Sequence, residues 1–186
     1  MALDYGRWFN YVAGLLGLII VVSLITAPRL SLYTLEPCED TDINIVFKFG
    51  HSVAWGRYGR YNELNTYRDI FMKDMVNRGT ITARMCMTEQ ELQAIFDKAV
   101  EIDFFNYPDS YTPKLGEAAA RPSHSYNFVL EISNGSVTKK VGWSDRVTPL
   151  NDKDFDNLFS LTSFIMDIVR NKPEYKALPE PTAGYI

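Results

Sequence analysis

The chain has 186 residues, of which 46% are hydrophobic and 23% are charged, and its formal net charge is −4. This apolar content is enough for the core of one folded domain, and it excludes a disordered or low-complexity chain. The weakly negative charge also excludes the class of proteins that bind phosphate backbones through a positive electrostatic field, so we expect no nucleic-acid partner.

Residues 1–30 predict a short tail and a transmembrane anchor. The 19 residues at positions 9–27 contain no charged side chain, and as a helix they would span about 28 Å, close to the hydrocarbon thickness of a bilayer. A core helix of a soluble domain would carry a polar stripe, which this segment lacks. A cleaved signal peptide would end in small residues, whereas Ile25 and Pro28 surround Ala27. We therefore expect an uncleaved signal anchor.

The anchor also predicts where the rest of the chain works. When a short amino-terminal tail and a span precede a large domain, the tail normally stays in the cytoplasm and the domain is exported. The positive charges give little further indication of orientation, because Arg7 and Arg29 lie on opposite sides of the span. We expect a single-pass protein of the cytoplasmic membrane with its C-terminal domain outside the cytoplasm. Ala13 and Gly17 form a small-xxx-small pair that either is incidental or lets a helix of another membrane-protein subunit approach.

The two cysteines are candidates for one disulfide in an oxidising compartment. Cys38 lies in the linker of residues 31–42, and Cys86 lies in the following domain. The alternative is a pair of buried or free thiols. The cysteines lack the C-x-x-C spacing of zinc and redox sites, and the chain has only two histidines, so we expect neither a metal nor a cofactor.

Residues 43–172 predict one α+β domain. Residues 43–50 are rich in β-forming side chains, and residues 80–87 alternate apolar and polar like a strand with one buried face. Thr88 and Glu91 form an S/T-x-x-E capping box in front of apolar residues at helical spacing. A helix should therefore begin directly after Thr88.

The second half of the domain predicts a hairpin and a last helix. Asn134-Gly135 separates two alternating runs and favours a type I′ turn, in which both central residues have positive φ. The apolar stripe of residues 152–171, with Phe155 and Phe159 among its members, should pack on the sheet.

The tail and the fold class follow from these elements. The Pro-rich residues 173–186 should lie extended over the domain or order on a partner. We predict an antiparallel sheet of about five strands with two helices on one face, preceded by the single transmembrane helix.

Aromatic and basic residues alternate in the segment "HSVAWGRYGRY" at positions 51–61. Arg57 and Tyr58 could bind a ligand there by charge and stacking, or the segment could be a Gly-rich loop whose aromatic side chains cover the core. His51 and His124 have no spacing that requires a metal or a catalytic pair.

Three segments resemble those of a group of bacterial secreted or membrane-attached, lipoprotein-like proteins. Their shared pattern is N-x-L-x-T, then K-D-M-V, then E-I-D-F-F-x-Y-P, and it covers Asn62, Leu64, Thr66, residues 73–76 and residues 101–108. The resemblance implies a compartment and a fold, and it implies no established activity.

Polar residues inside this match are candidate ligand contacts. We single out Asn62, Thr66, Lys73 and Asp74; the alternative is that they close turns or pair locally.

Three functions agree with the sequence. The first is a membrane-anchored extracytoplasmic binding or protein-interaction module without catalysis. The second is an accessory single-span subunit of a larger membrane complex. The third is a small hydrolase in which His124 acts with distant carboxylates.

Overall fold

The computed structural model describes residues 37–51, 61–113, 125–149 and 151–181. The predicted transmembrane anchor, Arg57, Tyr58 and His124 lie outside these residues. Within the described ranges, no helix combines the length and the apolar character that a membrane span requires.

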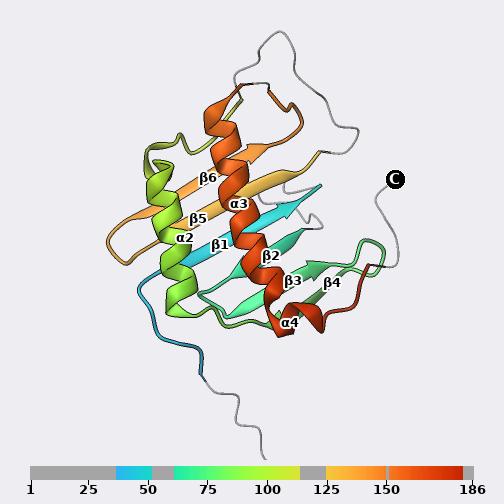
Figure 1. Cartoon of the computed structure of the whole chain (residues 1–186). Helices are drawn as coiled ribbons and strands as arrows, with labels where there is room; N and C mark the ends of the chain where they lie inside the picture. Colours follow the sequence, from blue (N-terminus) through green and yellow to red (C-terminus); the bar gives the residue numbers. More distant parts are fainter. Residues whose placement is uncertain (1–36, 52–60, 114–124, 150, 182–186) are drawn as a thin grey trace, which may run out of the picture. The chain divides into compact units, whose positions relative to one another are not determined.

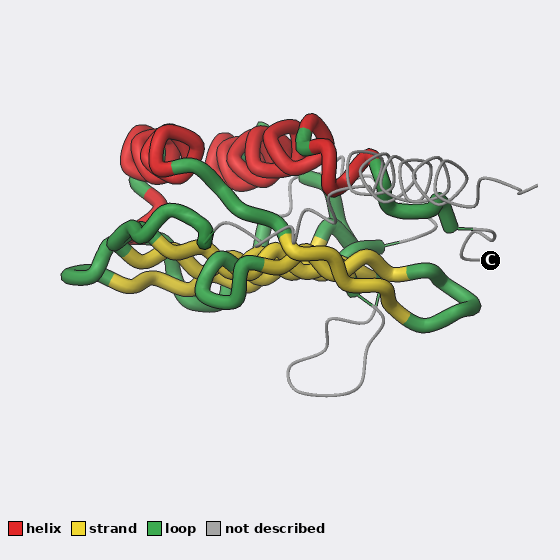
Figure 2. The backbone as a smooth tube through the Cα atoms, turned by 90° about the horizontal axis from the view of Figure 1, so that it is seen from below, coloured by secondary structure: helices red, strands yellow, loops and turns green. Residues whose placement is uncertain are grey.

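Six strands in the described part of the chain form one antiparallel sheet, in the order β4-β3-β2-β1-β5-β6 (Figure 1). The strands are β1 (Asn44–Gly50), β2 (Asn62–Asn65), β3 (Ile70–Asp74), β4 (Thr80–Arg84), β5 (Asn127–Ser133) and β6 (Thr138–Ser144). Helices α2 (Glu89–Glu101) and α3 (Lys153–Asn171) cover the same face of this sheet (Figure 2). The predicted α+β class and the placement of both helices on one face are confirmed.

The sheet has one strand more than the five that we expected, because β2 and β3 are separate strands joined by a tight turn. Arg68 N–H donates to the Asn65 carbonyl (3.3 Å), and Asp69 N–H donates to the Thr66 carbonyl (3.4 Å). Asp69 has a φ of 52°, a left-handed conformation that aspartate tolerates better than most residues. The turn therefore forms without the glycine that would have marked it in the sequence.

The β5–β6 hairpin is confirmed, with a turn shifted by one residue. Asn134 N–H donates to the Val137 carbonyl (3.1 Å), so Gly135 and Ser136 are the central residues. Only Gly135 has a positive φ, 81°, which is the pattern of a type II′ turn and corrects the predicted type I′ turn. The Asn134 carboxamide oxygen accepts the N–H of Val137 (2.9 Å), which explains why asparagine precedes the turn.

Helix α2 begins where its capping box predicts. Thr88 Oγ1 accepts from the Glu91 N–H (3.2 Å), and the Glu91 carboxylate accepts from the Thr88 N–H (2.8 Å). The buried face of the helix consists of Leu92, Ile95 and Ala99, which lie at helical spacing and pack on the sheet.

Helix α3 is held at both ends. At its start, the buried Asp152 carboxylate accepts from the Phe155 N–H (3.2 Å) and from the Tyr111 hydroxyl (2.7 Å). Burial, and then the bond to the Asp152 carboxylate and its charge, raise the pKa of Tyr111 far above its ordinary value, so the phenol keeps its proton. At the other end, the Lys172 ammonium pairs with the Glu91 carboxylate of α2.

The centre of the core is a row of cross-strand neighbours on the helix-covered face of the sheet. Val141, Leu130, Phe47, Leu64 and Phe71 pair successively from β6 to β3, and each is at most 1% exposed. Full burial of each such side chain stabilises the fold by roughly 1.5–3 kcal/mol. We call this set the inner row.

The stripe of α3 differs from the prediction at one residue. Phe155 and five further apolar residues are buried as an amphipathic helix requires, but Phe159 is 50% exposed. Phe159 faces an open groove beside the helix rather than the sheet. Phe159 therefore lies outside the buried stripe of α3.

The chain after α3 also differs from the extended tail that we expected. Pro173–Lys176 form the one-turn helix α4, with Pro173 at the first helical position, where its missing N–H costs nothing. Leu178 N–H then donates to the Tyr175 carbonyl (3.0 Å), and the Leu178 side chain is 9% exposed. This segment is therefore docked on the domain as far as Pro181, the last described residue.

Candidate functional site

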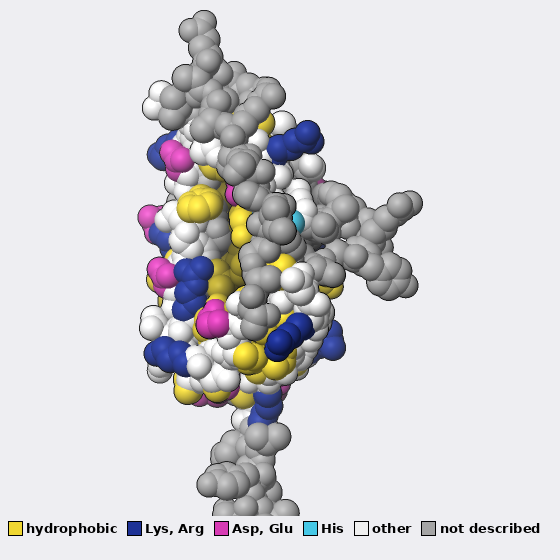
Figure 3. Space-filling view, turned by 90° about the vertical axis from the view of Figure 1, so that its right-hand side faces the viewer, with side chains coloured by type: hydrophobic (Ala, Val, Ile, Leu, Met, Phe, Trp, Pro, Cys, Tyr) yellow, Lys and Arg dark blue, Asp and Glu magenta, His cyan; other side chains and the backbone are white. Residues whose placement is uncertain are grey.

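Residues of α3 and of the ends of β1 and β3 line a groove; Figure 1 draws these strand ends on its right-hand side. The groove consists of two adjoining cavities of about 500 and 330 Å³, which share Phe49, Tyr126, Met166 and Arg170. Figure 3 looks onto this side and shows hydrophobic side chains gathered between the helix layer and the sheet, with lysine and arginine side chains near them. We call it the α3 groove.

The register of the sheet builds the floor of the α3 groove. Two residues along each strand from the inner row lies a second row, in which Trp143, Phe128, Phe49 and Asn62 are successive cross-strand partners. Lys73 continues this row on β3, two residues after Phe71 of the inner row. Because alternate residues of a strand point to the same face, this outer row also faces the helices.

The outer row changes character along its length. Phe128 stacks on Trp143 with ring centroids 5.4 Å apart, and Phe49 stacks on Phe47 of the inner row at 5.1 Å. The row then becomes polar at Asn62 and positively charged at Lys73. The groove floor is thus aromatic over β5 and β1 and cationic over β3, and Trp143 on β6 supports it by stacking on Phe128 without lining the groove.

Lys73 is a buried cation, only 4% exposed. Its ammonium lies 3.1 Å from the Glu180 carboxylate and 5.1 Å from the centroid of the Tyr175 ring. The Glu180 side chain is 83% exposed, so it closes the mouth of the pocket and is itself in water. Because Glu180 is in water, this pair contributes little to stability, whereas a carboxylate that shared the burial of the ammonium would form a strong, charge-assisted hydrogen bond.

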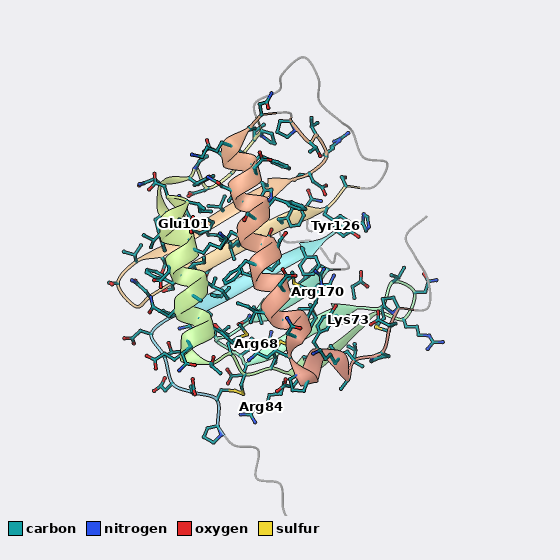
Figure 4. All side chains as sticks on the ribbon, in the orientation of Figure 1. Arg68, Lys73, Arg84, Glu101, Tyr126 and Arg170 are labelled. Carbon is teal, nitrogen blue, oxygen red and sulfur yellow. A yellow bond between two sulfur atoms is a disulfide. The ribbon has the colours of Figure 1, made fainter. Side chains whose placement is uncertain are left out.

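Arg170 adds a second positive charge at the same end. Its guanidinium pairs with Asp167 of the same helix at 3.7 Å, and its side chain is 58% exposed. A pair of this kind is weak and screened by water. Figure 4 shows Arg170 on α3 and Lys73 on β3 on the same side of the molecule as Tyr126.

The other end of the α3 groove contains Asp145. Its carboxylate accepts from the Tyr126 N–H (2.5 Å). Burial raises the pKa of Asp145, while the Tyr126 hydrogen bond and the nearby His51 lower it, and burial prevails. His51 Nδ1 donates to the Ser125 carbonyl (3.1 Å), and its ring lies 4.3 Å from that of Tyr126. The two ends therefore differ in charge, with the cations near β3 and a carboxyl near β5.

The predicted site residues do not all meet. The structure places Asn62, Lys73 and Asp74 in the α3 groove. Asn62 and Asp74 also shape the backbone there: the Asn62 carboxamide oxygen accepts from the Asp74 N–H (3.0 Å), and Asp74 Oδ1 accepts from the Val76 N–H (2.9 Å).

Thr66 lies at the opposite end of β2. Its hydroxyl accepts from the Ile45 N–H (2.8 Å) and donates to Asn44 Oδ1 (3.3 Å), so it fastens the β2–β3 turn to β1. Thr66 lines a separate polar cavity of about 330 Å³ beside Glu39, Asp40 and Asp69. In the described ranges, no three His, Cys, Asp or Glu side chains are arranged to hold a metal ion.

The structure joins Cys38 and Cys86 by a disulfide, with Cα atoms 5.3 Å apart. The bond ties the segment before β1 to the segment that follows β4. It lies beside the cavity of Thr66, and it is not part of the α3 groove.

Several groove residues were missed in the sequence. Tyr126, Met166, Arg170 and Glu180 come from segments far apart in the chain, and only the fold brings them to Lys73. One signal was present, because Phe159, Met166 and Arg170 lie on one side of α3 at helical spacing. Comparison with protein-family models and with curated proteins gave no match to this chain.

Proposed function

We propose that this protein is a membrane-anchored, extracytoplasmic binding module without catalysis, and that the α3 groove holds a ligand with an anionic head and an apolar body. The observation that carries the proposal is the position of Lys73. Its ammonium is buried at the end of an aromatic floor, and among the described residues its charged partner is the exposed Glu180.

The energetics of a buried ammonium support a binding role. Removing an ammonium from water costs several kcal/mol in principle, and a partner in water returns little of this cost. A buried position two residues after Phe71 of the inner row would be more stable with an apolar side chain. The lysine is understandable if an incoming carboxylate completes its hydrogen bonds and the aromatic rings contact the rest of the ligand.

The compartment is supported by two further features. The apolar segment of residues 9–27 has the length of a bilayer span, and the Cys38–Cys86 disulfide suits an oxidising compartment outside the cytoplasm.

A pair of small probes tests the ligand class. We would label the full-length chain with [¹³C-methyl]methionine in detergent micelles and titrate it with 3-phenylpropionate or its neutral analogue 3-phenylpropionamide. Met166 lines the groove and reports on binding, whereas Met85 is buried in the core and is not among the lining residues. We expect the Met166 methyl signal to shift with the acid, at roughly tenfold lower concentration than with the amide, because a charge-assisted hydrogen bond contributes about 1.5–3 kcal/mol.

Two variants complete this test. Lys73→Met should remove the preference for the acid. Lys139→Met is the matched control. Lys139 lies on β6, its side chain is also largely buried, and its ammonium lies 2.7 Å from the exposed carboxylate of Asp109. The proposal is wrong if the acid and the amide shift Met166 equally, or if Lys139→Met has the same effect as Lys73→Met.

A further inference from the structure

The α3 groove is already partly occupied by the chain's own C-terminal segment. Leu178 is 9% exposed against the core, Glu180 pairs with Lys73, and Pro181 lines the same cavity. Helix α4 delivers this segment to the groove directly after α3. The contact identifies one kind of molecule that this surface accepts, namely a peptide.

The sequence of the segment explains why it fits. Pro179 and Pro181 each restrict the residue before them to β or polyproline II conformations, which reduces the entropy that Leu178 and Glu180 lose when the segment docks. The segment presents an apolar anchor to the core and a carboxylate to Lys73.

The occupant is weakly held at its charged end. Glu180 is 83% exposed, and ion pairs with one partner in water contribute little to stability. The aromatic part of the groove, around Phe49, Phe128 and Phe159, is not filled by residues 178–181, because among them only Glu180 and Pro181 line the groove, and both line the cavity next to Lys73. A longer peptide from another protein can contact both parts.

We infer that the α3 groove recognises an extended acidic peptide of a partner protein, with an apolar residue two positions before a glutamate and a proline between them. Residues 178–181 are then a built-in competitor that occupies the Lys73 pocket until the partner arrives. This inference rests on the proposed function and names its ligand as a peptide. Lys73 and Arg170 would attract either an acidic peptide or a fatty acid, but the segment already seated there, whose Glu180 pairs with Lys73, favours the peptide.

A labelled copy of the segment tests the inference. We would measure fluorescence anisotropy of a fluorescein-labelled Ala-Leu-Pro-Glu-Pro peptide with the full-length protein in detergent micelles. The variants would be wild type, Glu180→Gln, and the matched control Asp109→Asn, which removes the exposed partner of Lys139 on β6. Thermal unfolding by circular dichroism would show that each variant is folded.

Glu180→Gln should bind the peptide about two- to fivefold more tightly than wild type, which is the gain expected from weakening an exposed ion pair of the competitor. Asp109→Asn should match wild type. A peptide with glutamine in place of glutamate should bind Glu180→Gln about two- to fivefold more weakly, because it loses the same ion pair, and Lys73→Met should bind the two peptides equally.

The outcomes separate this inference from the proposed function. If 3-phenylpropionate shifts Met166 as expected but the glutamate and glutamine peptides bind equally, the ligand is not an acidic peptide and only the inference is wrong. If decanoate shifts Met166 and the peptide does not bind, the groove holds a fatty acid and the inference is again wrong. If 3-phenylpropionate also leaves the Met166 methyl signal unchanged, the proposed function is wrong as well.

Discussion

Replacement of Lys73 by methionine should leave the protein as stable as wild type or make it more stable. Methionine keeps most of the apolar stem and removes the ammonium. The lost pair with Glu180 is worth about 0–1 kcal/mol because Glu180 is 83% exposed, and the lost contact with the Tyr175 ring is worth about 0.5–1 kcal/mol. Against this, exchange of a buried ion pair for apolar side chains is often neutral or stabilises by about 1–4 kcal/mol.

Because this range already includes the lost pair, subtraction of the ring contact leaves a gain of about 0–3 kcal/mol, which corresponds to a rise in Tm of roughly 0–12 °C for a chain of this size. Circular dichroism of the full-length protein in detergent measures it, and Lys139→Met, with 18% of its side chain exposed, should change Tm less. A loss of more than about 1 kcal/mol in Lys73→Met would show that the lysine supports the fold, and the reasoning would be refuted.

Three further predictions concern the fold. Leu130→Ala should lower the free energy of unfolding by about 2–5 kcal/mol in urea titrations, because Leu130 is fully buried in the inner row, and an unchanged midpoint would contradict that packing. Exchange of Cys38 and Cys86 for serine should lower it by about 2–4 kcal/mol, since the bond closes a loop across a sequence separation of 48, and equal stability of the two proteins would contradict this. Burial raises the pKa of Glu91, but its bonds to Lys172 and Thr88 lower it by more, so the net pKa lies below the ordinary 4.5. The ionised carboxylate then stabilises the fold above about pH 4.5, and this contribution disappears as the pH falls through the lowered pKa. Glu91→Gln should therefore have a lower free energy of unfolding than wild type at pH 7, and the two free energies should approach each other in strong acid.

Local signals predicted the elements that depend on local contacts. The capping box of Thr88 and Glu91 places the start of α2 because both hydrogen bonds lie within four residues. The β5–β6 hairpin was predicted for a similar reason, and its turn shifted because Asn134 accepts hydrogen bonds with its side chain instead of adopting positive φ. The β2–β3 turn was missed because Asp69 takes the left-handed conformation that glycine usually signals.

The groove was only partly predictable because it depends on contacts between distant segments. Asn62 and Lys73 were among the predicted binding residues, and both lie on the outer row. Phe128 joins the same row through its pairing with Phe49 in the register between β1 and β5, which no single segment encodes. Phe159 was assigned to the buried stripe because it follows Phe155 by four residues. Helical spacing shows on which side of α3 a residue lies, but it does not show how far the sheet extends beneath that side.

The attachment of α3 at both ends has a consequence for molecular recognition. Asp152 holds the first turn through Tyr111, and Lys172 joins the last turn to Glu91 of α2. One wall of the groove is therefore preorganised, so that the entropy lost on association falls on the incoming molecule and on the displaced residues rather than on the helix. The ligand preference of the groove can then change by substitution of single side chains such as Phe159, which is half exposed, while α3 and the sheet keep their arrangement.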